Sequence, residues 1–65
     1  MKLLVNDKEV QTSAKLLSEL LLEINLPQTG IAVAVNNRII PRTKWDYYTL
    51  ESDSKIVIIK AVCGG

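Results

Sequence analysis

The residues best placed to do chemistry stand together at the end of the chain, in the order Cys63, Gly64 and Gly65. Glycine has no side chain, so two terminal glycines can enter a narrow channel in whatever backbone conformation the channel requires. They leave the terminal carboxylate as the reactive group, and a carboxylate must be activated before a nucleophile can attack it. The usual route is a mixed anhydride with a nucleotide, formed where phosphate charge is stabilised. We therefore expect a partner enzyme to carry out this chemistry.

Plainer interpretations of this ending remain open. Chain ends are usually disordered, so Gly64 and Gly65 can be a frayed terminus, and they can also be a cloning scar. Cys63 is either a small apolar residue that ends a strand or a tail thiol that exchanges with sulfur on a partner. Because it is the only cysteine, the chain cannot form an internal disulfide, which fits a reducing compartment such as the cytoplasm.

The other side chains argue against a free-standing enzyme. The chain has no histidine, which excludes Ser-His and Cys-His dyads, HExxH zinc sites and histidine proton shuttles. One cysteine cannot build a thiolate zinc site, and the sequence contains no glycine-rich phosphate loop. We interpret the 7 carboxylates as solvated surface groups. We therefore expect no catalytic residue, no metal site and no cofactor bound by the chain itself.

Length and charge narrow the class of protein further. The 65 residues make one small domain, and 48% of them are hydrophobic, which is enough for one compact core. The net charge of +1, with basic and acidic residues interleaved, argues against a nucleic-acid binder, which would show a basic stripe. The apolar runs are too short to span a bilayer, and residues 1–7 do not resemble a signal peptide. We expect neither nucleic acid nor a membrane as a partner.

Apolar runs separated by turn residues predict strands on both sides of a single helix. The strands are expected at residues 2–6, 9–11, 31–35, 38–40 and 55–62. Asparagine accepts positive φ readily, so the pair at residues 36–37 predicts a tight turn between two of these strands. Residues 42–45 predict an irregular or 3₁₀ turn, in which Trp45 closes the edge of the core.

The helix is expected at residues 14–25, starting from the hydroxyls of residues 12–13 and ending at Asn25 before Pro27. The pattern includes no capping box at this start. Residues at helical spacing predict a core-facing stripe of Leu17, Leu20, Leu21 and Ile24, widened by Leu16. Residues between them are expected to face away from the core: Lys15, Ser18, Glu19 and Glu23.

This order of elements favours an α+β fold in which a mixed five-stranded sheet has one helix packed across it. The first and last strands, at the two ends of the chain, form the most apolar pair, so we expect them side by side in the centre of the sheet. They must then be parallel, with the helix as part of the crossover connection between them. That arrangement is a ubiquitin-like β-grasp formed by residues 1–65 as a single domain, with a flexible tail at residues 63–65.

The alternation of side chains along the last strand predicts which residues lie on the face of the sheet that the helix does not cover. Ile56 and Ile58 should point toward the helix, because strand residues alternate between the two faces. The residues expected on the opposite face are Leu4, Ala34, Val57 and Ile59. An exposed apolar patch marks a partner site, so we predict that this face binds a partner protein.

The sequence resembles a known family. Residues 30–42 (GIAVAVNNRIIPR), followed by Trp45, Leu50 and the Gly-Gly ending, resemble the ThiS-type sulfur carriers of thiamine (thiazole) biosynthesis. The most specific part is the N-x-x-I-x-P-R-x-x-W pattern at residues 36–45 combined with the terminal glycines, since either half alone is a weak signal. The resemblance covers the whole chain and implies a carrier with the β-grasp fold.

The resemblance also implies a reaction sequence on Gly65, with Gly64 as its flexible neighbour. An adenylyltransferase resembling the ubiquitin-activating enzymes would use ATP to adenylate the Gly65 carboxylate. Sulfur from a cysteine-desulfurase persulfide would displace AMP and leave a thiocarboxylate, which thiazole synthase would use.

The sequence departs from the family pattern in the turn before the last strand. The family usually has a glycine there, and this chain has Asp53. Aspartate can adopt positive φ at modest cost, so we still expect the same fold.

Three other functions fit parts of the same pattern. The small subunit of molybdopterin synthase also carries sulfur on a terminal Gly-Gly, but it is typically longer and lacks the pattern of residues 36–45. A ubiquitin-like modifier would instead be joined to lysines of other proteins through Gly65. An interaction domain would dock through its sheet without any chemistry at the tail.

Overall fold

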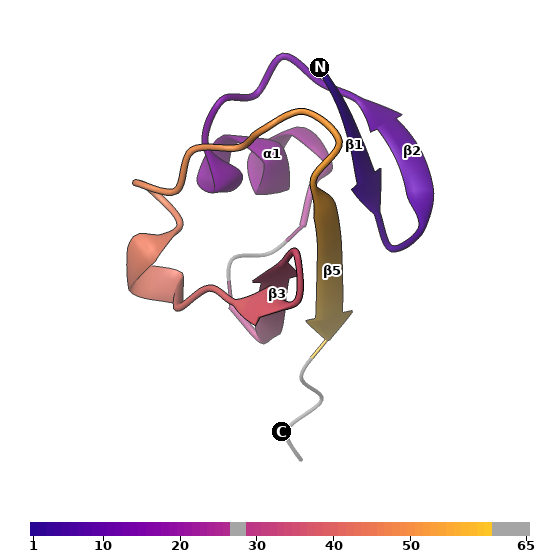
Figure 1. Cartoon of the computed structure of the whole chain (residues 1–65). Coiled ribbons are helices and arrows are strands. Elements are labelled where there is room, and N and C mark those ends of the chain that lie inside the picture. Colours follow the sequence, from indigo (N-terminus) through magenta and orange to yellow (C-terminus); the bar gives the residue numbers. More distant parts are fainter. Residues whose placement is uncertain (27–28, 61–65) are drawn as a thin grey trace.

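The computed structural model describes residues 1–26 and 29–60. Its elements are β1 (Lys2–Val5), β2 (Lys8–Gln11), α1 (Leu17–Glu23), β3 (Ile31–Val35), β4 (Arg38–Ile39), a 3₁₀ turn (Arg42–Lys44) and β5 (Lys55–Lys60), as Figure 1 shows. Predictions for Pro27 and for residues 61–65 lie outside the described residues.

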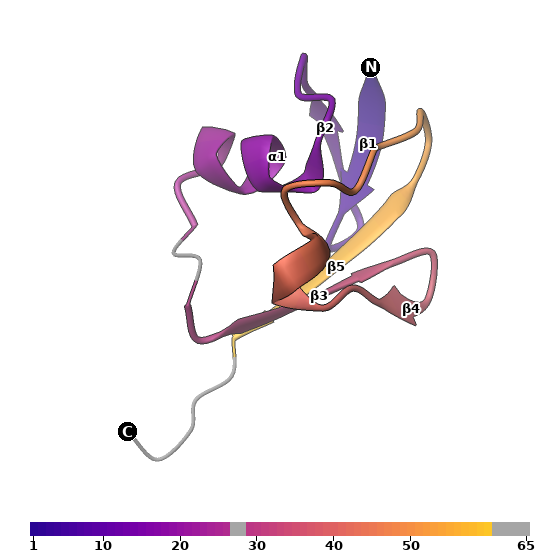
Figure 2. The same cartoon turned by 90° about the vertical axis from the view of Figure 1, so that its left-hand side faces the viewer.

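The strands form one five-stranded sheet in the order β2-β1-β5-β3-β4. The central pair, β1 and β5, is parallel, and the other neighbours are antiparallel. α1 lies on one side of this sheet (Figures 1 and 2). The predicted α+β fold, with its five-stranded mixed sheet and single helix, is confirmed, including the parallel central pair.

Two hairpins depend on asparagine at positive φ. The β1–β2 turn has φ of 50° at Asn6 and 66° at Asp7, and the β3–β4 turn has 50° at Asn36 and 71° at Asn37. Two-residue turns with both central residues at positive φ match the twist of antiparallel strands. Asp53 has φ of 67° in the turn before β5, so an aspartate does adopt the conformation expected of a glycine there.

The helix begins later than the sequence predicted, at Leu17 instead of residue 14. The Leu17 N–H donates to the Tyr48 carbonyl at 3.0 Å, and the Ser18 N–H donates to the Trp45 carbonyl at 3.1 Å. Leu16, which precedes the helix, is extended, and the Lys15 carbonyl accepts a hydrogen bond of 2.8 Å from the Leu50 N–H. The distant loop therefore binds the first amides of α1, whereas the Thr12 hydroxyl accepts from the Ala14 N–H, at 3.0 Å, outside the helix.

Glu19 caps the helix start, a role that the sequence analysis missed. Its Oε1 accepts hydrogen bonds from the N–H groups of Lys15, at 2.9 Å, and Leu16, at 3.1 Å. Both hydrogen bonds lower the pKa of Glu19 from its usual value, and the bond from the Lys15 N–H has the larger effect. The interaction therefore stabilises the fold above the unfolded pKa and is lost as the pH falls through the folded pKa.

The helix ends at Glu23, two residues before the predicted end, and Asn25 then adopts the expected left-handed conformation with φ of 60°. The Asn25 N–H donates to the Leu22 carbonyl at 3.1 Å, and the Leu26 N–H donates to the Leu21 carbonyl at 3.0 Å. This pair of bonds is a Schellman motif, in which a left-handed residue allows the last carbonyls to be satisfied. Leu26 then packs against the core.

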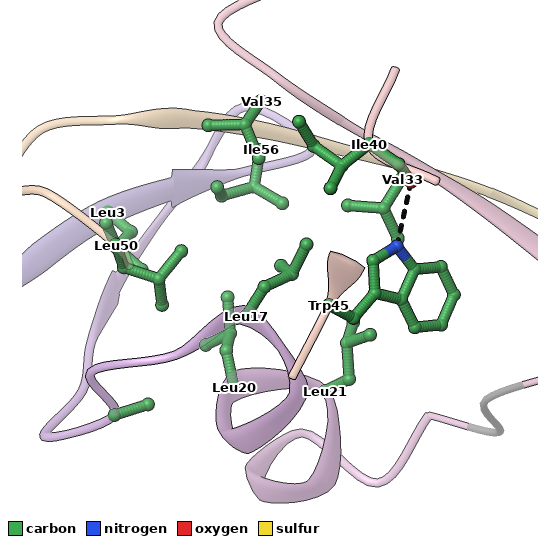
Figure 3. Packing of buried hydrophobic residues seen from close by; sticks show 11 residues of the cluster. Leu3, Leu17, Leu20, Leu21, Val33, Val35, Ile40, Trp45, Leu50 and Ile56 are labelled. Carbon is green, nitrogen blue, oxygen red and sulfur yellow. Dashed lines mark hydrogen bonds between the residues drawn. The ribbon is translucent and has the colours of Figure 1, made fainter. Parts of the chain in front are cut away.

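The core lies between α1 and the sheet, and Figure 3 shows its side chains meeting there. Buried apolar residues from every layer contribute: Leu3, Ala14, Leu17, Leu20, Leu21, Val33, Val35, Ile40, Trp45, Leu50 and Ile56. Trp45 is 3% exposed, and its Nε1–H donates to the Ile40 carbonyl at 2.9 Å. Ser18 was expected to face away but is buried, because α1 packs against the Trp45 loop as well as the sheet.

Candidate functional site

The last strand, β5, presents opposite faces to the core and to solvent. Ile56 is fully buried and Ile58 packs against the core, so both point toward the helix. Val57 and Ile59 alternate with them, and Ile59 is 54% exposed. The predicted facing of this strand is therefore confirmed, and Ile59 is a large apolar side chain in contact with solvent.

Neighbouring strands bring the other predicted residues to the same face. Across the β3–β5 ladder, Ala34 pairs with Val57 and Ala32 pairs with Ile59. Leu4, on β1, is also exposed and lies on the face of its strand opposite the buried Leu3. The four residues predicted for the partner face thus share one face of the sheet, although their binding role stays a prediction.

The sequence analysis missed Ile39, which extends this face. Ile39 pairs with Ala34 across the β3–β4 hairpin and is 67% exposed. A two-residue turn at residues 36–37 places residue 39 opposite residue 34, so the register was available from the sequence. We call the resulting surface the open face: Leu4, Ala32, Ala34, Ile39, Val57 and Ile59.

Charges border the open face on the β1 side. Lys2 Nζ lies 3.8 Å from a Glu9 carboxylate oxygen and 3.6 Å from an Asp53 carboxylate oxygen. All three side chains are well exposed, so each pair contributes less than about 1 kcal/mol to stability. The apolar surface therefore has a polar margin, as protein–protein contact surfaces usually do.

The predicted reactive end, residues 63–65 with Cys63, Gly64 and Gly65, lies outside the described residues. The strand that precedes this end is described, since β5 ends at Lys60 and the sequence continues from it to Gly65. Gly65 is six residues after Ile59, so the carboxylate can lie at most roughly 20–22 Å from Ile59 on the open face. A partner that covers this face can therefore also receive the chain end.

Groups that could supply chemistry are scarce in the rest of the molecule. Across residues 1–26 and 29–60, no group of three or more Cys, Asp or Glu side chains is arranged to hold a metal ion. Within the same residues, no helix is long and apolar enough to cross a membrane. The described part of the chain thus offers an exposed apolar surface and a strand that leads toward the tail.

The sequence model of the ThiS family matches residues 2–65, nearly the whole chain. The chain belongs to the ThiS family. The sulfur carrier protein ThiS of Escherichia coli (strain K12) is similar to it, with 32% identity over 66 residues that cover 100% of both chains. The crystal structure of the thiamine biosynthesis protein ThiS from Geobacter metallireducens has the same fold, with a TM-score of 0.85, 23% identity and full coverage of both chains.

Proposed function

We propose that this member of the ThiS family is a sulfur carrier of thiamine biosynthesis, which delivers the sulfur atom of the thiazole ring from a thiocarboxylate on Gly65. The observation that carries this proposal is the family match, which extends through the terminal glycines to residue 65. The full-length similarity to a sulfur carrier protein of E. coli supports it. The chain is a carrier rather than a catalyst, and its cytoplasmic location remains a prediction.

The chemistry requires activation in a partner that uses ATP. A Gly65 carboxylate oxygen attacks the α-phosphate, pyrophosphate leaves, and an acyl-adenylate forms. The terminal sulfur of a desulfurase-derived persulfide then attacks the acyl carbon, and AMP leaves. A thiol reductant cleaves the resulting acyl disulfide, which releases the thiocarboxylate for thiazole synthase. Because Gly64 and Gly65 have no side chains, the same chain end can enter the active site of each partner.

The open face is the surface that would hold the carrier on the activating enzyme. On the side of the sheet away from α1, the large side chains of Leu4, Ile39 and Ile59 are exposed and the other three residues are half-buried. β5 is part of this surface and leads toward the tail. Burying such side chains on binding favours association by roughly 25 cal/mol per Å² of apolar surface. The same docking would direct the chain end into the active site.

Introducing a charge into the open face should weaken binding without unfolding the domain. We expect Ile59→Asp to raise the Kd for the activating enzyme by at least about tenfold, because a carboxylate would lose its hydration in the interface. Leu22→Asp is the matched control, since Leu22 is 64% exposed on the helix and Ile59 is 54% exposed on the sheet. Calorimetric titration measures the Kd of each variant for the activating enzyme. Equal binding by the two variants would contradict the assignment of the open face.

A growth assay tests the biological role. The chain should restore growth without added thiazole in a bacterial strain that lacks its own thiazole sulfur carrier, and a strain lacking the small molybdopterin synthase subunit should not be rescued. Rescue of the second strain alone would assign the chain to molybdopterin synthesis. Accumulation of the chain on lysines of other proteins, without either rescue, would indicate a protein modifier.

A further inference from the structure

Asn6 makes an unusual contact with the end of β5. The Ile58 N–H donates to Asn6 Oδ1 at 2.8 Å, and Asn6 Nδ2–H donates to the Ile58 carbonyl at 3.2 Å. The main-chain N–H of Asn6 also donates to the Ile56 carbonyl at 2.9 Å. One asparagine therefore holds β5 through both its backbone and its side chain.

The side chain substitutes for a missing piece of β1. In the parallel ladder, the N–H groups of Leu4 and Asn6 donate to the carbonyls of Ser54 and Ile56, two residues apart on the opposite chain. A longer β1 would offer its next main-chain groups to Ile58. Asn6 has φ of 50° and turns the chain into β2, so its carboxamide supplies the acceptor and the donor instead.

This contact is the last one on its side of β5 within the described residues. The β1–β5 register covers Lys55 and Ile56, whereas β3 pairs with β5 as far as Lys60 on the opposite side. Beyond the register, the β1 side of β5 borders a surface hollow of about 480 Å³, whose lining includes Asn6, Ile58 and Lys60. Without the carboxamide, the described hydrogen bonds to the end of β5 would come from β3 alone.

We propose that Asn6 is a positioning residue for sulfur loading, which fixes the end of β5 and so sets the point and direction from which the chain continues toward Gly65. This inference rests on the proposed function, because the position of the carboxylate matters only if a partner acts on it. Attack of the Gly65 carboxylate on the α-phosphate requires the reacting atoms to be about 3–3.5 Å apart and aligned, so looseness at the base of the tail lowers the fraction of productive encounters.

Asn36 provides a matched control at the other end of the same strand. Its N–H donates to the Lys55 carbonyl at 2.8 Å, and its Oδ1 accepts from the Lys55 N–H at 2.9 Å. It also has φ of 50°, as Asn6 has. Glycine tolerates this conformation, so Asn6→Gly and Asn36→Gly both remove side-chain bonds to β5 while keeping the turns. Only the first change loosens the end of β5 that leads to the tail.

The experiment measures adenylation of the full chain by an activating enzyme, as ATP-dependent pyrophosphate release at varied carrier concentration. We expect Asn6→Gly to lower kcat by about tenfold, with KM within about twofold of wild type because the open face is intact. Asn36→Gly should keep the wild-type kcat even though its Tm also falls. Asn6→Asp should recover part of kcat, since it restores the acceptor for the Ile58 N–H but not the donor.

Amide hydrogen exchange provides a readout that does not depend on the partner. Exchange at residues 58–60 should accelerate in Asn6→Gly and not in Asn36→Gly. Equal kcat for the two glycine variants, or equal exchange at residues 58–60, would overturn the positioning role and leave Asn6 as a structural residue. Absence of adenylation in the wild type, with the exchange difference present, would instead refute the proposed function and with it the role of Asn6 in loading.

Discussion

Removing Gly65, or adding one residue after it, is expected to abolish sulfur loading while leaving the folded domain unchanged. The buried apolar core consists of residues between Leu3 and Ile56, so neither change removes a side chain from it. Either change displaces the carboxylate by roughly one residue, about 3.5 Å, which is as large as the whole distance between the reacting atoms when the carboxylate attacks the α-phosphate. Circular dichroism should show equal Tm values, and pyrophosphate release should occur with the wild type only.

Cys63→Ser is the matched control for the tail variants, because it changes the tail without changing its length. If Cys63 only ends a strand, this variant should be adenylated and loaded like the wild type. Loss of loading with normal adenylation would show that the thiol takes part in sulfur transfer. A truncated or extended chain that is loaded like the wild type would contradict the assignment of Gly65.

The largest effect on stability is expected from Trp45→Ala. Trp45 is 3% exposed, donates to the Ile40 carbonyl and, through its own carbonyl, binds the Ser18 N–H at the helix start. Replacing a buried tryptophan by alanine costs about 3–5 kcal/mol. A domain of this size has a total stability of only about 3–10 kcal/mol. We therefore expect a large fraction of Trp45→Ala to be unfolded near 37 °C, as measured by urea denaturation.

Two further variants separate packing from hydrogen bonding at this position. Trp45→Phe retains an aromatic ring but removes the donor to Ile40, so its stability should lie between those of Trp45→Ala and the wild type. Tyr47→Ala, at a side chain that is 78% exposed in the same loop, should change the free energy of unfolding by less than about 0.5 kcal/mol. A Trp45→Ala chain as stable as Tyr47→Ala would contradict this account of the core.

Features that depend on local chemistry were predicted well from the sequence. The turn at residues 36–37, the left-handed Asn25 after the helix and the left-handed Asp53 all follow from side chains that tolerate positive φ. The helix start was wrong because its first amides bind the carbonyls of Trp45 and Tyr48, about 30 residues away in sequence. The local pattern holds one sign of the later start, Glu19 three residues after Leu16, but not these distant carbonyls.

The same difference between local and long-range features applies to the candidate site. Period-two alternation along β5 is a local property, and it correctly separated Ile56 from Ile59. The contact between Asn6 and Ile58 joins residues 52 positions apart, and it exists only because β1 and β5 pair in one particular register. From the sequence alone Asn6 is a turn residue, and its second role becomes visible only when the parallel pair is formed.

The most direct test of the sulfur-carrier function is mass spectrometry of the wild-type chain after incubation with an activating enzyme, ATP and a cysteine-desulfurase sulfur source. The intact mass should increase by the difference between one sulfur and one oxygen atom, and fragmentation should locate the change on the terminal carboxyl group of Gly65. An unchanged mass, or an added sulfur located on the thiol of Cys63, would contradict it.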